Sequence, residues 1–164
     1  MFSFGFSWIG ALFLVLLFIP KLIWAKHQPE GYDPGGEGRF MQGLERVGQI
    51  LVTAMSLCFG SLTLRPWTVW SWFLVAASFC MALYEGFWLR YFLRGHSLGD
   101  FYGSFCGIPV AGATLPVLAA ICLGLYGQSL WFVLAALILG IGHIGIHLQH
   151  KKELFLQRSR KNNA

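Results

Sequence analysis

Residues 140–150 read Gly140-Ile-Gly-His143-Ile-Gly-Ile-His147-Leu-Gln-His150 and close a long apolar run. The three histidines are separated by four and three residues, so on a helix of ~3.6 residues per turn their rings share one face. Ala136 and Gly140 continue that face toward the start of the run with small side chains. We therefore predict a helical bundle organised around this small and imidazole-rich face.

The composition predicts that most of the chain lies in a lipid bilayer. Of the 164 residues, 56% are hydrophobic and 12% are charged, whereas a soluble domain carries about 25% charged residues. Five apolar runs have the length of about 20 residues that a transmembrane helix needs. They lie at 4–24, 44–64, 68–93, 105–126 and 129–148. We predict one all-α integral membrane domain over 1–164, a five-transmembrane-helix bundle with a loop at 25–43 and a basic tail at 149–164.

The Lys and Arg residues predict the orientation of this bundle. Of the 12 in the chain, all but Arg65 lie in or beside the 25–43 loop, in the connection after the third span, or in the tail. Because cytoplasmic segments carry the excess of positive charge, we predict a multi-pass protein of the cell membrane with its N-terminus outside and its C-terminus in the cytoplasm. The net charge of +5 does not indicate a nucleic-acid partner, because the basic residues flank the spans and form no basic helix face. The predicted partner is the lipid bilayer.

Glu85 lies inside the third predicted span, where a lone carboxylate is penalised by several kcal/mol. At about 1.5 Å per residue, Glu85 and His143 lie about 12 Å and 9 Å from the cytoplasmic ends of their spans. A carboxylate and an imidazole at one depth stabilise each other's charged forms. We predict that Glu85 meets His143 or His147 in a cytoplasm-facing cavity, and that these three residues are catalytic.

Polar residues near the cytoplasmic ends of the spans are predicted to bind the polar end of a substrate. These residues are Glu45, Arg46, Gln49, Arg90 and His150. Glu45 and Gln49 share a helix face with Ser56, and such a face turns inward in a membrane protein. The loop at 25–43 is rich in Gly and Pro, which predicts irregular structure, either a hydrated connector or a flap over the site.

The fourth predicted span carries small residues at every fourth position, namely Gly103, Gly107 and Ala111. This spacing predicts a seam against which a neighbouring helix packs closely. Pro109 and Pro116 interrupt the same span, and each removes a backbone donor. They predict either a kinked packing helix or a local opening that lines a cavity.

Three functional classes fit these residues. The first is a membrane-embedded enzyme that acts on a lipid-like or amphipathic small molecule, with histidine as general acid or base and Glu85 orienting it. The second is a small-solute or proton-coupled transporter that uses Glu85 and the histidines as a titratable relay. The third is a non-catalytic membrane binding or assembly protein, in which the polar residues only lock helix packing.

A divalent metal is a variant of the enzyme hypothesis. The two histidines of His143-x3-His147 lie one helical turn apart, which is a usable ligand spacing, and Glu85 would supply a third ligand. The His-Glu-x-x-His motif of metal-dependent proteases is absent, because residues 144–146 read Ile-Gly-Ile. The sequence therefore leaves open whether the site holds a metal.

Overall fold

The structure is a computed structural model, which describes residues 5–33, 35 and 37–162. Its elements are α1 (Trp8–Trp24), α2 (Arg39–Cys58), α3 (Ser71–Leu93), α4 (Leu98–Phe101), α5 (Ala111–Tyr126) and α6 (Leu130–Asn162), and the described residues form no strand, only isolated β-bridges. The all-α prediction is confirmed. Parts of three predicted segments lie outside the described residues: residue 4 of the first span, 34 and 36 of the loop, and 163–164 of the tail.

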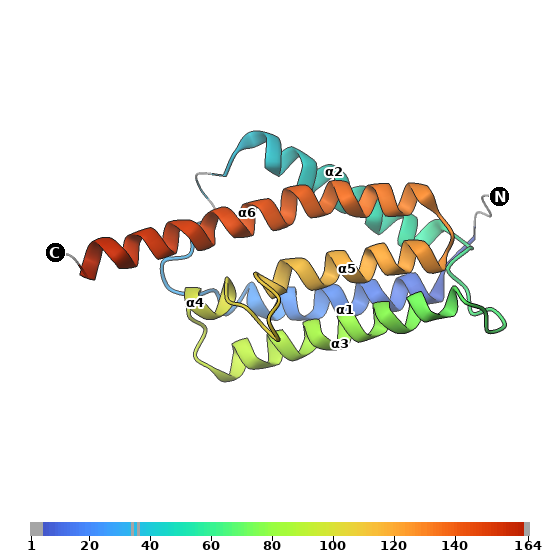
Figure 1. The fold of residues 1–164 in the computed structure, drawn as a ribbon, viewed down its shortest axis with the longest axis horizontal. Coiled ribbons are helices and arrows are strands. Elements are labelled where there is room, and N and C mark those ends of the chain that lie inside the picture. The colour runs from blue at the N-terminus through green and yellow to red at the C-terminus, as the bar shows by residue number, and fades with distance from the viewer. Residues whose placement is uncertain (1–4, 34, 36, 163–164) are drawn as a thin grey trace.

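Helices α1, α3, α5 and α6 run along one axis, and α2 lies obliquely across α6 (Figure 1). Helix α6 packs against α2 and α5, while α3 packs against the other side of α5. Helix α1 contacts α2 and α3. Helix α5 therefore separates α3 from α6, which decides which polar residues meet.

Helix α2 differs from the predicted second span at both ends. It begins at Arg39 and stops at Cys58, so the prediction of a helix from 44 to 64 is wrong. Residues 59–64 instead fold over the end of the bundle, where Leu62 is 1% exposed and its carbonyl oxygen accepts a hydrogen bond of 2.8 Å from Ser7. The apolar residues after Cys58, which extended the predicted span too far, lie over the helix ends instead.

Helix α5 begins at Ala111, six residues later than the predicted start at 105. Three residues of the preceding segment have positive φ angles that a right-handed helix cannot contain: Cys106 at 50°, Gly107 at 80° and Val110 at 42°. The segment forms a tight turn, in which Phe105 and Ile108 exchange two backbone hydrogen bonds of 3.1 and 2.9 Å. The early start of the predicted span is therefore wrong.

The predicted seam of Gly103, Gly107 and Ala111 is also wrong, because its first two members precede α5. A Cβ atom on Gly107 would meet nothing within 4 Å. Helices α2 and α6 do form a close contact through glycines. A Cβ atom on Gly48 would collide with the Leu139 backbone, and one on Gly142 would lie 2.7 Å from the Met41 carbonyl oxygen.

Helix α6 has 33 residues and continues through most of the predicted tail, projecting beyond the other helices (Figure 1). Two segments are long and apolar enough to cross a membrane by length and composition: Ser71–Leu93 and Leu130–Gln157. Helices α1 and α5 are apolar but shorter, with 17 and 16 residues. To this extent the membrane prediction agrees with the structure.

Candidate functional site

A carboxylate–imidazole pair joins helices α2 and α6 at a point where their backbones approach closely. Glu45 Oε1 of α2 lies 2.6 Å from His143 Nδ1 of α6. An ionised carboxylate only accepts hydrogen bonds, so Nδ1 carries the hydrogen and Nε2 keeps a lone pair. Gly48 and Gly142 lie on the same two helices within one turn of the pair, and their close backbone approach brings Glu45 to His143.

His147 and His150, the other histidines of the predicted face, follow His143 along α6. The His143 and His147 ring centroids are 4.7 Å apart, and Tyr102 lies 5.4 Å from the rings of both His147 and His150. His143 and His150 are buried, and Ala136 is fully buried farther along α6. The prediction that this face of α6 turns into the bundle is confirmed.

A cavity of about 350 Å³ lies beside the Glu45–His143 pair. Its walls are formed by Lys21, Trp24, Ala25, Tyr32, Glu37, Glu45, Trp88, Phe101, Gly112, His143, Ile146 and His147. A second cavity of about 50 Å³ lies next to it between the helices. The two cavities share Lys21, Glu45 and His143, which therefore stand at their junction.

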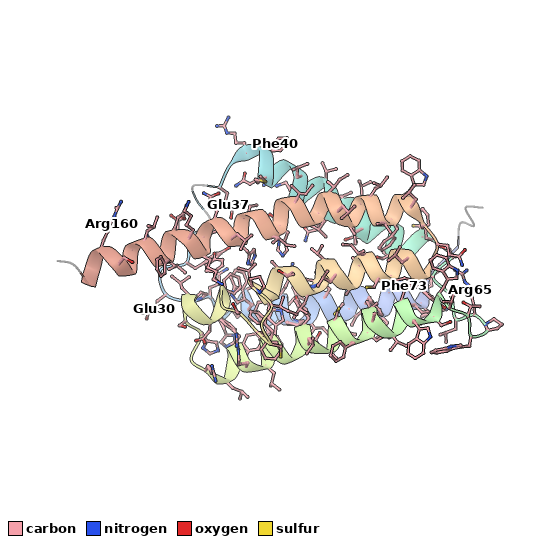
Figure 2. All side chains as sticks on the ribbon, in the orientation of Figure 1. Glu30, Glu37, Phe40, Arg65, Phe73 and Arg160 are labelled. Atoms are coloured by element: carbon pink, nitrogen blue, oxygen red, sulfur yellow. The ribbon has the colours of Figure 1, made fainter. Side chains whose placement is uncertain are left out.

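The connection between α1 and α2 covers one end of the larger cavity. Glu37 bridges α6 and α2, since its Oε1 lies 3.2 Å from His150 Nε2 and its Oε2 accepts a 3.1 Å hydrogen bond from Gln42. Figure 2 shows Glu37 where this connection passes between the two helices. Tyr32 packs edge-on against Trp24 and Phe101, at centroid distances of 5.0 and 5.9 Å. Ala25, Tyr32 and Glu37 of the predicted loop therefore line the larger cavity.

Tyr32 of this connection and Tyr102, which follows α4, keep their protons well above neutral pH. Burial raises the pKa of Tyr102, and the nearby Tyr32, Glu37 and Glu153 add to the shift. Burial also raises the pKa of Tyr32, with further contributions from Glu37, Glu45 and Asp33. Both hydroxyl groups therefore remain hydrogen-bond donors at neutral pH.

The structure does not bring Glu85 to the histidines. Helix α5 stands between α3 and α6, and Glu85 lines neither cavity. Its neighbours on the helix surface, Ser78 and Leu89, are exposed, and Glu85 Oε1 is buried without a hydrogen-bond partner among the described residues. The predicted Glu85–His143 contact is replaced by the Glu45–His143 contact, because α6 packs against α2.

The predicted substrate-binding residues separate into different places. Glu45 lines both cavities and Gln49 the narrow one. Arg46 is exposed and lines neither cavity. Arg90 donates a 2.9 Å hydrogen bond to the Ser104 carbonyl oxygen and lies over the Phe105 ring, so it holds the turn before α5. His150 contacts Glu37 at the cover.

The predicted metal site of His143, His147 and Glu85 is not formed. Among residues 5–33, 35 and 37–162, no group of three or more His, Cys, Asp or Glu side chains has an arrangement that could hold a metal ion. Glu85 lies on α3, whereas the histidines lie on α6. The rings of His143 and His147 contact each other edge-on, with centroids 4.7 Å apart. The carboxylate beside His143 is that of Glu45, which binds the ring directly, and not that of Glu85.

Sequence reasoning missed several residues of the cavity wall. Lys21 was assigned to the charges that flank the first span, yet it lines both cavities. Its position after Pro20, before the end of the apolar run, is a signal that it lies inside the helix. Trp24 and Trp88 carried no such signal, because aromatic residues near span ends are common.

Comparisons with protein-family models, curated proteins and solved structures find no match for this chain.

Proposed function

We propose that the protein is a five-span membrane protein. Large apolar side chains remain exposed along the outer helix faces, namely Leu12, Val15, Ile19 and Leu22 on α1, Val75, Phe79 and Leu89 on α3, and Leu134, Leu137 and Ile141 on α6. Such continuous apolar surface is rare on a soluble monomer. In both apolar segments of spanning length, fewer than half of the residues are buried, unlike the core helix of a soluble protein.

The proposed orientation puts the larger cavity at the cytoplasmic side. Arg65 stands at one end of the bundle, while Glu30 and Arg160 mark the opposite end (Figure 2). The exposed tryptophans Trp8, Trp67 and Trp131 gather at the Arg65 end, as expected for an interfacial belt. The excess of Lys and Arg at the Glu30 end favours the cytoplasm for that end.

We infer that the protein is a membrane-embedded enzyme acting on an amphipathic substrate that enters from the cytoplasmic leaflet. The observation that carries this proposal is the Glu45–His143 hydrogen bond in the wall of an open cavity of about 350 Å³. A pair that only locked helix packing would be enclosed by tightly packed side chains, with no space for a ligand. The adjacent volume therefore favours a functional pair.

The pair has the arrangement of a general base with its orienting group. Glu45 accepts the Nδ1 hydrogen of His143, which fixes the tautomer and leaves the Nε2 lone pair to take a proton. When Nε2 takes a proton from substrate or water, the Glu45 carboxylate stabilises the imidazolium. Such a base typically accelerates a reaction by about 10²- to 10⁴-fold.

The transporter alternative has less support. The narrow cavity extends to Ser56, Leu123 and Phe132, but its walls include no residue of the segments that close the outer end. There Tyr126 donates a 2.6 Å hydrogen bond to the Thr63 carbonyl oxygen, which ties the cover of that end to α5. A cavity that opens toward one side favours an enzyme or a binding protein over a carrier.

Isotope incorporation into membrane lipids tests the enzyme proposal without a known substrate. The full-length protein in nanodiscs is incubated with a total membrane lipid extract in ¹⁸O water and, separately, in deuterium oxide. We expect mass spectrometry to find label in one class of amphipathic molecule. An ¹⁸O label indicates attack by water, and a deuterium label indicates proton exchange at carbon.

The His143→Gln variant should reduce incorporation by about 100-fold or more, because it removes the base. His27→Gln is the matched control, since His27 is exposed and lines neither cavity. Equal incorporation by the wild type and His143→Gln would contradict the enzyme proposal. Flux of a solute in proteoliposomes, with no label in any lipid, would favour the transporter.

A further inference from the structure

We propose that the ligand is a single-chain amphipath with an oxyanion headgroup, carboxylate or phosphate, held beside Lys21 with the first carbons of its hydrocarbon chain in the narrow cavity. This inference deepens the proposed function and rests on it, because the same cavity receives the substrate. It follows from three features of the walls: an unpaired cation, two carboxylates that are already engaged, and an apolar tunnel.

Lys21 supplies a positive charge at the junction of the two cavities. It lies near enough to Glu45, His143 and His147 to interact with each electrostatically. No ion pair within 4.0 Å and no hydrogen bond of its ammonium group is found among the described residues. An ammonium group held away from bulk water is stabilised by an anion, so the site favours a negatively charged ligand.

The acidic residues of the same cavity are occupied by other partners. Glu45 binds His143, and both oxygens of Glu37 are engaged, one with His150 and one with Gln42. A cationic headgroup would have to compete with these contacts, whereas an anion at Lys21 displaces none of them.

The narrow cavity fits the first carbons of a hydrocarbon chain. Apart from the three junction residues, its walls are mainly apolar, and they include Leu17, Val52, Met81, Val117, Leu123 and Phe132. Glu45 and Ser56, at its two ends on α2, are eleven residues apart, or about 16 Å at ~1.5 Å per residue. Since a water molecule needs about 10–15 Å³ of such space, a cavity of about 50 Å³ has room for the first few carbons of one chain and excludes a branched or two-chain lipid.

Binding of three probes with one chain length tests the headgroup. Dodecanoate, dodecyl phosphate and dodecyltrimethylammonium are titrated onto the full-length protein in nanodiscs, and bound ligand is counted by native mass spectrometry. We expect the first two probes to bind and the ammonium probe to bind at least tenfold more weakly. The ratio between dodecanoate and dodecyl phosphate identifies which oxyanion the site prefers, and acetate and inorganic phosphate measure binding without a chain.

Variants at Lys21 assign the headgroup to its side chain. Lys21→Met should weaken dodecanoate binding by about tenfold to hundredfold, the usual effect of losing a charge-assisted contact. Lys21→Arg should restore most of it, which shows that the loss did not come from misfolding. Lys26→Met is the matched control, because Lys26 is exposed in the loop and lines neither cavity.

Two outcomes would overturn the inference: tighter binding of the ammonium probe, or equal dodecanoate affinity in the wild type and Lys21→Met. The His143→Gln variant separates this result from the enzyme proposal. Normal dodecanoate binding by this variant and by the wild type, with no isotope label from either, would refute the enzyme and leave the inference standing. Label that depends on His143, combined with an unaffected Lys21→Met, would do the reverse.

Discussion

Replacing Gly48 by alanine should separate α2 from α6 and weaken the site between them. The new Cβ atom would collide with the backbone of Leu139, and the Leu139 Cβ atom would lie 2.7 Å away. Backbone atoms within a helix cannot turn aside as the end of a flexible side chain can, so the helices must move apart. Glu45 lies one turn from Gly48, and its 2.6 Å contact with His143 must lengthen with them.

The cost of this displacement can be estimated from overpacked interiors. Inserting one carbon into a close contact typically destabilises a protein by about 1–3 kcal/mol. At roughly 2–4 °C per kcal/mol for a chain of this size, Tm should fall by about 2–12 °C. The measurement is thermal unfolding in detergent, followed by near-ultraviolet circular dichroism, with isotope incorporation measured on the same samples.

Gly43→Ala is a matched control on the same helix, because a Cβ atom there would meet nothing within 4 Å. Alanine is the better helix former by about 1 kcal/mol, so this variant should be as stable as the wild type or slightly more stable. A Tm for Gly48→Ala equal to or above that of Gly43→Ala would refute the close contact between α2 and α6. It would also remove the explanation for how Glu45 reaches His143.

Three further predictions concern topology, the acidic residues and alkaline pH. A reporter fused to the C-terminal tail should be cytoplasmic and one inserted at Gln128 external, as a protease-protection assay would show; the reverse would invert the site's orientation. Glu45→Gln should lower isotope incorporation by about tenfold or more, while Glu85→Gln, outside both cavities, should leave it unchanged; a larger effect from Glu85→Gln would restore the original hypothesis. Folding raises the pKa of Tyr102, so this residue contributes stability that is complete below about pH 10 and is lost as the pH rises further. The Tyr102→Phe variant should therefore show a smaller decline in Tm at alkaline pH. An unchanged pH profile would contradict the burial of this hydroxyl.

The sequence was sufficient to predict which face of α6 turns into the bundle, but not which carboxylate lies opposite that face. The spacing of His143, His147 and His150 has a single meaning on a helix, because the period of a helix fixes which side chains share a face. The identity of the facing carboxylate depends on the order of helices around the bundle. Glu45 and Glu85 were both plausible by depth, and only the position of α5 between α3 and α6 excluded Glu85.

The ends of the helices were also beyond the reach of hydropathy. An apolar run does not distinguish a helix from an apolar segment that covers helix ends, and residues 59–64 belong to the second kind. The turn before α5 depends on positive φ angles at Cys106 and Val110, which no preference of those residue types indicates. Lys21 was missed because a cation near a span end usually reaches the headgroups.

The pairing of α2 with α6 constrains how the protein can be made. Glu45 and His143 are 98 residues apart in the chain, and at about 5–20 residues per second a ribosome needs about 5–20 seconds to travel between them. Throughout that interval α2 is without the helix that covers it and binds its carboxylate. The site is therefore assembled last, and a chain truncated before α6 exposes an unpaired Glu45 that cellular quality control could recognise.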